Sequence, residues 1–336
     1  MLNTSDKNLA LELVRGTEAA VMASGRWLGR GDKNEVDRAA VEALRYMLNT
    51  VSMRGVVVIG EGEKDEAPML FNGEALGTGE GPELDIAVDP IDGTTLMAKG
   101  LTGAISVVAA ADRGSMFSPE DLFYMDKIVT GPEAADFIDI EAPVQVNIRR
   151  VAKAKNKSPE DVTVVMLNRP RNDEIRKEIQ SIGARMRLIP DGDISGALTT
   201  CWRDAYSADL LLGSGGSPEA VITACAVKCL GGNMQCRPYF RNEEDESKAK
   251  ARGLDRSTVL TIDDLVKGDN VFFAATGAST GDLLKGVSYR GDHIRTWSLC
   301  MRGKSGTVRY IEAIHSLKKL NRLNTVIDYS PKHPDA

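Results

Sequence analysis

The chain has 336 residues, with 42 Lys and Arg against 48 Asp and Glu, which gives a net charge of −6 and an isoelectric point near 5.4. This acidic balance, without a stripe rich in Lys and Arg, excludes a general nucleic-acid-binding protein. The longest apolar run, 104–111, is too short to span a bilayer, and charges in the first sixteen residues argue against a secretory signal there. We therefore expect a cytoplasmic protein with neither a membrane nor a nucleic-acid partner, built as one large domain or two ordinary ones.

The first half of the chain is expected to form an α+β domain over residues 1–145. Apolar residues at three- and four-residue spacing predict amphipathic helices over 6–29 and 35–50. Short strand-like runs, separated by turn-rich pieces, follow at 55–60, 84–89, 104–111 and 122–130. Helices followed by successive strands are typical of an α+β arrangement.

The second half, 146–336, is expected to form an α/β domain. Strands are predicted at 162–167, 184–190 and 209–213, alternating with helices at 172–183, 194–201 and 217–230. This alternation predicts a mostly parallel, layered sheet. The charged segment 241–257 is expected to be an exposed helix or loop, and further strands are predicted at 271–277, 293–301 and 306–315.

The five cysteines do not indicate a disulfide framework or a zinc site. No C-x-x-C pair occurs among Cys201, Cys225, Cys229, Cys236 and Cys300. We expect them to be reduced thiols, mostly buried as small apolar side chains.

The first chemical motif is LDIAVDPIDGTT, at 84–95. Its apolar start is typical of a strand interior, and its proline is expected to end the hydrogen-bonding ladder. Asp89, Asp92 and the Thr94 hydroxyl are then expected to converge at the strand end, where Gly93 permits a turn. Neighbouring carboxylates repel each other, so the pair predicts a bound cation. A second interpretation makes Thr94 the cap of a following helix.

Further acidic side chains follow a strand or begin a helix. The strand-like run 55–60 leads into Glu61 and Glu63, interpreted either as metal ligands or as a solvated turn. Asp37 is expected in the first turn of its helix, either as a ligand or as an acid that the helix dipole favours by up to about 1 kcal/mol. Carboxylates grouped without His or Cys select hard cations such as Mg²⁺ or Mn²⁺, which commonly serve phosphate chemistry.

The second half carries residues suited to a phosphate and a polyol. LLLGSGGSPEAV, at 210–221, predicts a strand, a glycine-rich loop and a helix start whose N–H groups suit an anion, with Glu219 in the first turn. Loop residues at strand ends in α/β sheets commonly meet ligands. Four such side chains follow the strands at 162–167 and 184–190: Arg169, Arg171, Asp191 and Asp193.

DPIDGT, at 89–94, resembles the signature of the lithium-sensitive, metal-dependent phosphatase superfamily, which includes inositol monophosphatases and fructose-1,6-bisphosphatases. Longer segments are similar, in the same order and along nearly the whole chain, to class II fructose-1,6-bisphosphatases. These segments are WLGRGDKNEVDRAAVEA (27–43), VVIGEGEKDEAPML (57–70), RPRNDE (169–174), IPDGDIS (189–195) and GSGGSPEAV (213–221). The resemblance implies a layered α-β-α-β-α sandwich. It also implies hydrolysis of the 1-phosphate of fructose 1,6-bisphosphate in gluconeogenesis, with Mn²⁺ or Mg²⁺ as cofactor.

The resemblance also implies roles for individual residues. The implied metal ligands are Asp37, Glu61, Asp89, Asp92 and Glu219. The implied catalytic residues are Asp37, Glu61 and Thr94, with Thr94 hydrogen-bonded to Asp37 so that the pair orients and deprotonates water. The implied substrate contacts are Asp92, Gly93, Thr94, Tyr124, Arg169, Pro170, Arg171, Asp191, Gly192, Asp193 and Gly216, with Phe123 as the alternative to Tyr124. The chain departs from many class II members at Asp92 and Arg169, where Glu and Lys are common.

The resemblance leaves the substrate and the assembly open. Alternative activities are those of a sedoheptulose 1,7-bisphosphatase, a dual-function bisphosphatase or an inositol-phosphate phosphatase. A non-catalytic sugar-phosphate sensor is a further alternative, but a sensor is expected to lose acids from the metal set, and all five positions here are acidic. We expect a small-molecule sugar bisphosphate as partner and a homo-oligomer, either a dimer or a tetramer.

Overall fold

The computed structural model describes residues 8–62, 69–120, 122–202, 208–323 and 325–331. It divides into two compact units, of which the first joins 1–113 to 270–336 and the second is 114–269. The expected boundary at 145/146 differs from this division, because strands after residue 270 pair with strands from the first 113 residues.

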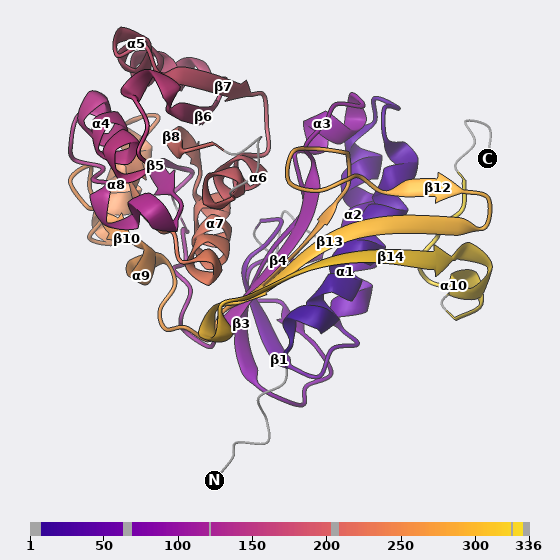
Figure 1. Ribbon diagram of the computed structural model, residues 1–336. Coiled ribbons are helices and arrows are strands. Elements are labelled where there is room, and N and C mark those ends of the chain that lie inside the picture. The colour runs from indigo at the N-terminus through magenta and orange to yellow at the C-terminus, as the bar shows by residue number, and fades with distance from the viewer. Residues whose placement is uncertain (1–7, 63–68, 121, 203–207, 324, 332–336) are drawn as a thin grey trace. The chain divides into compact units, whose positions relative to one another are not determined.

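The described strands of the first unit form one eight-stranded mixed sheet, in the order β12-β13-β11-β4-β3-β1-β2 with β14 beside β13 (Figure 1). The strands are β1 Arg54–Ile59, β2 Ala75–Leu76, β3 Glu83–Asp92, β4 Ile105–Asp112, β11 Phe272–Gly277, β12 Ser288–Arg290, β13 His293–Arg302 and β14 Thr307–Ser316. β1 and β3 run parallel, whereas β4 runs antiparallel to both β3 and β11. The parallel pair brings the C-terminal ends of β1 and β3 to the same end of the sheet.

Two long helices of the first unit pack against each other and on one face of this sheet. Leu13 and Leu44 from these helices share a core with Ile86 and Val88 of β3, which accounts for the apolar spacing in the sequence. The helical segments are α1 Ala10–Ser24, η1 Gly25–Trp27, α2 Lys33–Leu48, α3 Thr94–Ala98, η6 Gly303–Ser305 and α10 Leu317–Leu323.

The described strands of the second unit form a six-stranded sheet in the order β10-β9-β5-β8-β6-β7. They are β5 Tyr124–Thr130, β6 Thr163–Leu167, β7 Arg185–Ile189, β8 Leu210–Gly216, β9 Asn233–Tyr239 and β10 Leu260–Thr261. β6 runs parallel to β7 and β8, but β5 runs antiparallel to both β8 and β9. The parallel arrangement predicted from the strands at 162–167, 184–190 and 209–213 is confirmed for β6, β7 and β8. The sheet as a whole is mixed, because β5 enters its centre in the opposite direction.

Helices cover both faces of the second sheet. α4 and α5 share a core with Ile128, Val164 and Leu210 on one face, whereas α6 packs on the other face against Val165. The helical segments are η2 Pro132–Phe137, α4 Val144–Ala154, η3 Pro159–Asp161, η4 Pro170–Asn172, α5 Asp173–Ser181, α6 Asp193–Leu198, η5 Thr199–Cys201, α7 Ser217–Leu230, α8 Glu243–Ala251 and α9 Ile262–Leu265. The predicted α/β class with layered helices and sheets is confirmed.

The structure also bears on the expectations about the cysteines and about membrane-spanning segments. The five cysteines are free thiols, and all but Cys201 are buried, as predicted. Within the ranges that the structure describes, every helix is too short or too polar to cross a bilayer.

Candidate active site

Asp89 and Asp92 lie on either side of a β-bulge near the end of β3. Their partners on β4 are Val107 and Ile105, so three steps along β3 match two along β4. The prediction that Pro90 ends the strand is wrong, because the bulge accommodates a residue without an N–H and pairing resumes at Asp92. Asp89 is half-buried and Asp92 is buried.

Thr94 is the first residue of α3, and its hydroxyl donates a hydrogen bond to Asp37 Oδ1 at 2.7 Å. The N-cap of α3 is Gly93, whose φ of +94° lies in the left-handed region that favours glycine. No backbone N–H of the helix start is capped by the Thr94 side chain in the described structure. The interpretation of Thr94 as a helix cap is therefore wrong.

Asp37 lies in the second turn of α2 and not in the predicted first turn, because the helix begins at Lys33, two residues before the predicted start. The N-cap is Asp32, whose side chain accepts a hydrogen bond from the Glu35 backbone N–H at 3.1 Å. Burial raises the pKa of Asp37, although the hydrogen bond from Thr94 and the charge of Lys33 oppose the shift.

Glu61 follows β1 at the same end of the sheet as Asp89. Ile59 pairs with Ala87, so Glu61 and Asp89 each lie two residues beyond this pair on parallel strands. The residue as a whole is exposed, but protein atoms crowd its carboxyl group; this burial and the nearby Asp37 carboxylate raise the pKa of Glu61 to about 7. Glu63 lies outside the described residues.

The second unit contains a buried cluster of charged side chains. Lys127, on β5, donates a hydrogen bond to Asp193 Oδ2 at 2.6 Å, and the two side chains are 2% and 8% exposed. Burial and the Asp193 carboxylate raise the pKa of Glu219, while the Lys127 ammonium opposes this shift. Asp193, expected to bind sugar hydroxyls, is thus already held by an ion pair.

The glycines of GSGG make room for these acids. A Cβ on Gly215 would lie 2.1 Å from Asp193 Oδ2, and a Cβ on Gly216 would lie 1.9 Å from Glu219 Oε2. Gly216 is also the N-cap of α7, and it still pairs with Tyr124 of β5 at the end of β8. The motif therefore lets carboxylates approach the backbone closely.

The predicted sugar-phosphate residues form two contacting groups within the second unit. Arg171 donates a hydrogen bond from Nε to the Ser214 carbonyl at 3.0 Å, and its guanidinium lies 4.3 Å from the centre of the Tyr124 ring. Arg169 Nη2 lies 3.7 Å from Asp191 Oδ1. Asp191 is followed by Gly192, the N-cap of α6, whose backbone is in the left-handed region. Two other predicted positions lie outside these groups. Pro170 is exposed, and Phe123, the alternative to Tyr124, has its ring centre 3.6 Å from Arg241 Cζ.

Lys127 is a buried charged residue of the second unit that the sequence motifs did not indicate. Its signal was a lysine inside the apolar run at 122–130, at a position that alternation places among buried side chains. A lysine there requires a buried partner, and Asp193 supplies it.

Lys127→Met is expected to lower the free energy of unfolding by about 3–5 kcal/mol, because it leaves the Asp193 carboxylate buried without its cation. The measurement is urea unfolding of the whole chain, followed by circular dichroism. Lys177→Met serves as the control, since Lys177 forms an exposed ion pair with Glu174 and its loss should leave the midpoint unchanged. Equal midpoints for the Lys127 variant and the parent would contradict the structural role of the pair.

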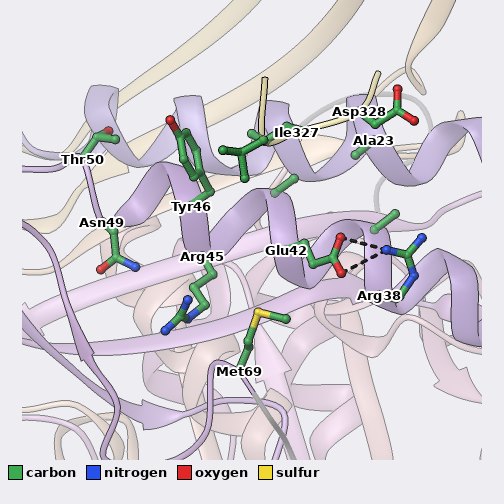
Figure 2. Close-up of a pocket in the computed structure, with 13 residues that line it drawn as sticks. Ala23, Arg38, Glu42, Arg45, Tyr46, Asn49, Thr50, Met69, Ile327 and Asp328 are labelled. Carbon is green, nitrogen blue, oxygen red and sulfur yellow. Dashed lines mark hydrogen bonds and ion pairs between the residues drawn. The ribbon is translucent and has the colours of Figure 1, made fainter. Parts of the chain in front are cut away.

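A cavity of about 390 Å³ in the first unit lies apart from the predicted residues. It is bordered by α2 side chains such as Arg45, by Met69 and by the C-terminal segment around Ile327 (Figure 2). Arg38 pairs with Glu42 at its rim. None of its lining residues is a predicted site residue.

The acids fit a hard divalent cation by their chemistry. No group of three or more Asp, Glu, His or Cys side chains already has metal-binding spacing within the described ranges. Asp37 and Glu61 nevertheless lie close enough to repel, which a cation would relieve. In the second unit, Glu219 Oε2 is buried and has no hydrogen-bond partner among the described residues. Carboxylate oxygens are the donors that Mg²⁺ and Mn²⁺ prefer.

Comparisons with known proteins agree with the motifs. A family model described as bacterial fructose-1,6-bisphosphatase, glpX-encoded, matches residues 7–315. A Haemophilus influenzae protein named fructose-1,6-bisphosphatase class 2 is 46% identical over 331 residues, which cover 95% of this chain and 99% of the relative. An Escherichia coli K12 protein named fructose-1,6-bisphosphatase 1 class 2 is 44% identical over 326 residues, which cover 93% and 96%. The chain therefore belongs to the glpX-encoded, class 2 family of bacterial fructose-1,6-bisphosphatases, which are metal-dependent phosphatases.

Proposed function

We infer that this protein hydrolyses the 1-phosphate of fructose 1,6-bisphosphate and releases fructose 6-phosphate and phosphate, a step of gluconeogenesis. The match to the family extends over nearly the whole chain. Within the structure, the observation that carries the inference is the hydrogen bond from Thr94 to Asp37. A hydroxyl held by a carboxylate is suited to orienting water and moving its proton.

The Thr94–Asp37 pair gives the reaction its means of activating water. Because Thr94 donates its proton to Asp37, the lone pairs of its oxygen remain to accept a hydrogen bond from a water molecule. Asp37 accepts the hydrogen bond from Thr94, so its carboxylate is placed to receive the proton. A proton passes from water through Thr94 to Asp37 while the water oxygen attacks phosphorus in line with the sugar oxygen that leaves.

We propose that Mn²⁺ or Mg²⁺ is held by a set of carboxylates: Asp37, Glu61, Asp89, Asp92 and Glu219. The bound metal supplies positive charge that stabilises the phosphoryl oxygens and the departing alkoxide. The repulsion between the Asp37 and Glu61 carboxylates and the buried oxygen of Glu219 support this assignment. Lithium sensitivity, which the superfamily resemblance implies, is part of the same proposal.

The remaining predicted residues are proposed to bind the sugar and its second phosphate. Arg171 and Arg169 carry the positive charge for the phosphate, and Arg171 is oriented by the Ser214 carbonyl and the Tyr124 ring. The other proposed contacts are Asp92, Gly93, Thr94, Tyr124, Pro170, Asp191, Gly192, Asp193 and Gly216. We also propose a cytoplasmic homo-oligomer, either a dimer or a tetramer.

Arg171→Ala is expected to raise KM for the bisphosphate about 10- to 100-fold, because a hydrogen bond to a charged group contributes roughly 1.5–3 kcal/mol. Turnover should change much less, since this phosphate does not react. Steady-state kinetics measure both, with Arg185→Ala, which removes an exposed ion pair with Asp161, as the control. A collapse of turnover with unchanged KM would place Arg171 at the reacting phosphate instead.

A substrate panel tests the proposed function. Phosphate release is compared for fructose 1,6-bisphosphate, sedoheptulose 1,7-bisphosphate and inositol 1-phosphate, and phosphorus NMR identifies the sugar phosphate that remains. We expect the highest kcat/KM with fructose 1,6-bisphosphate and fructose 6-phosphate as its product. Preference for either other substrate, or fructose 1-phosphate as the product, would overturn the assignment.

A further inference from the structure

Glu74 is a buried carboxylate in the first unit that the proposed reaction does not use. It is 5% exposed and lies directly before β2. Its Oε1 accepts a hydrogen bond from Arg45 Nε at 2.5 Å, and its Oε2 accepts one from the backbone N–H of Leu70. Glu74 therefore links helix α2 to the chain segment that contains Leu70.

Leu70 has an unusual backbone conformation, and its carbonyl contacts the predicted metal ligand Glu61. Its φ is +55°, in the left-handed region that a residue with a Cβ rarely adopts, and its side chain is fully buried. The Leu70 carbonyl accepts a hydrogen bond from the Glu61 backbone N–H at 2.9 Å. A Cβ on Gly60 would lie 1.8 Å from the same carbonyl oxygen, so the two chain segments touch at this point.

These contacts connect the helix that carries the predicted ligand Asp37 with the backbone of the predicted ligand Glu61. Arg45 lies on α2 eight residues after Asp37, and Asp37 is close enough to raise the pKa of Glu61. From Arg45 the path runs through Glu74 and Leu70 to the Glu61 backbone. The path therefore joins α2, which carries Asp37, to the backbone of Glu61 after β1.

We propose that Glu74, paired with Arg45, is a positioning residue that holds the Glu61 backbone in place against α2 through Leu70. This inference rests on the proposed role of Glu61 as a metal ligand. An ion pair with one exposed partner contributes little net stability, and the Arg45 side chain is 41% exposed, so stability alone does not account for this pair. Holding a ligand in one orientation is a function that groups beyond the ligands themselves commonly serve in metal sites.

A substitution at Arg45 can test the connection from Arg45 through Glu74 and Leu70 to Glu61 without disturbing the hydrophobic core. The Arg45 side chain is 41% exposed and borders the cavity beside Met69, the residue before Leu70 (Figure 2). A substitution at Arg45 therefore changes the charge partner of Glu74 while leaving the buried side chains of the first unit in place.

The first measurement is amide hydrogen exchange of the metal-free protein, with Glu74→Gln compared with the parent. Gln keeps the size of the side chain but loses its charge, so we expect the Glu61 and Leu70 amides to exchange at least ~10-fold faster. Glu42→Gln is the matched control, because it removes an exposed ion pair with Arg38 on the same helix. Glu42→Gln should leave the exchange of both amides unchanged.

The second measurement is calorimetric titration with Mn²⁺, together with steady-state kinetics. Glu74→Gln is expected to weaken Mn²⁺ binding about 10- to 100-fold and to lower kcat, with KM for the bisphosphate nearly unchanged. Arg45→Met should produce the same pattern, and Arg45→Lys, which keeps the positive charge, should restore part of the affinity. If Glu74→Gln does not fold, the Arg45 pair of variants carries the test.

The outcomes separate the positioning role from the proposed function. Unchanged exchange at Glu61 and Leu70 in both Glu74→Gln and Arg45→Met would overturn the positioning role. Faster exchange with unaltered Mn²⁺ affinity would overturn the assignment of Glu61 as a ligand. Faster exchange, weaker Mn²⁺ binding and partial restoration by Arg45→Lys, with Glu42→Gln unaffected, is the predicted result.

Discussion

Replacing Asp89 by Asn is expected to lower turnover at least ~10²-fold, which corresponds to about 2.7 kcal/mol of lost transition-state stabilisation. Asn keeps the shape of the side chain but removes a negative charge from the proposed metal ligands. Asp89 lies before the bulge of β3, so the substitution leaves the strand pairing intact. The measurement is phosphate release with saturating Mn²⁺, together with the affinity for Mn²⁺.

The control for this prediction is Asp112→Asn on the neighbouring strand. Asp112 is exposed and pairs with Leu84, at the opposite end of the β3–β4 ladder from Asp89. Its replacement should leave turnover unchanged. Near-normal turnover in Asp89→Asn with metal supplied would contradict the proposed metal site.

Thr94→Val is expected to lower turnover by ~10² or more, because it deletes the hydroxyl that donates to Asp37 while keeping the branched shape. Folding should survive, since the hydroxyl does not cap α3. Metal affinity should also survive, because Thr94 is not among the proposed ligands. Melting temperature, Mn²⁺ affinity and turnover are measured on the same samples.

Two further variants make the Thr94 prediction specific. Thr94→Ser keeps the oxygen and should restore much of the rate, whereas Thr95→Val alters the next residue of α3 and should leave turnover unchanged. An active Thr94→Val protein with a lowered melting temperature would make the hydroxyl structural. Water would then have no proton path through Thr94 to Asp37.

Local sequence patterns predicted where helices and strands lie better than they predicted which strands pair with one another. Apolar spacing located α2 and α7 within two residues, because a helix shows its buried face in its own sequence. The antiparallel pairings of β5 with β8 and of β11 with β4 join residues that are 80 or more positions apart in the chain. The alternation of apolar and polar residues in a strand does not indicate which other strand it pairs with. Neither the mixed second sheet nor the division into units was therefore predicted.

In the candidate site, too, the sequence indicated single residues but not the side chains with which they pair. Acids at strand ends were found from local sequence, because Asp89 and Glu61 stand directly beside turn residues. Lys127 and Glu74 were missed, since each acts through a partner distant in the chain: Asp193 for Lys127 and Arg45 for Glu74. Buried charges of this kind become interpretable only when their partners are known.

The most direct test of the central claim is phosphate release from fructose 1,6-bisphosphate by the purified protein. The assay is run with Mn²⁺, with Mg²⁺, and with EDTA followed by Mn²⁺. The proposed function predicts release of one phosphate per sugar with at least one of the two metals, loss of activity in EDTA, and recovery when Mn²⁺ is restored. Full activity in EDTA, or no release with either metal, would contradict a metal-dependent fructose-1,6-bisphosphatase.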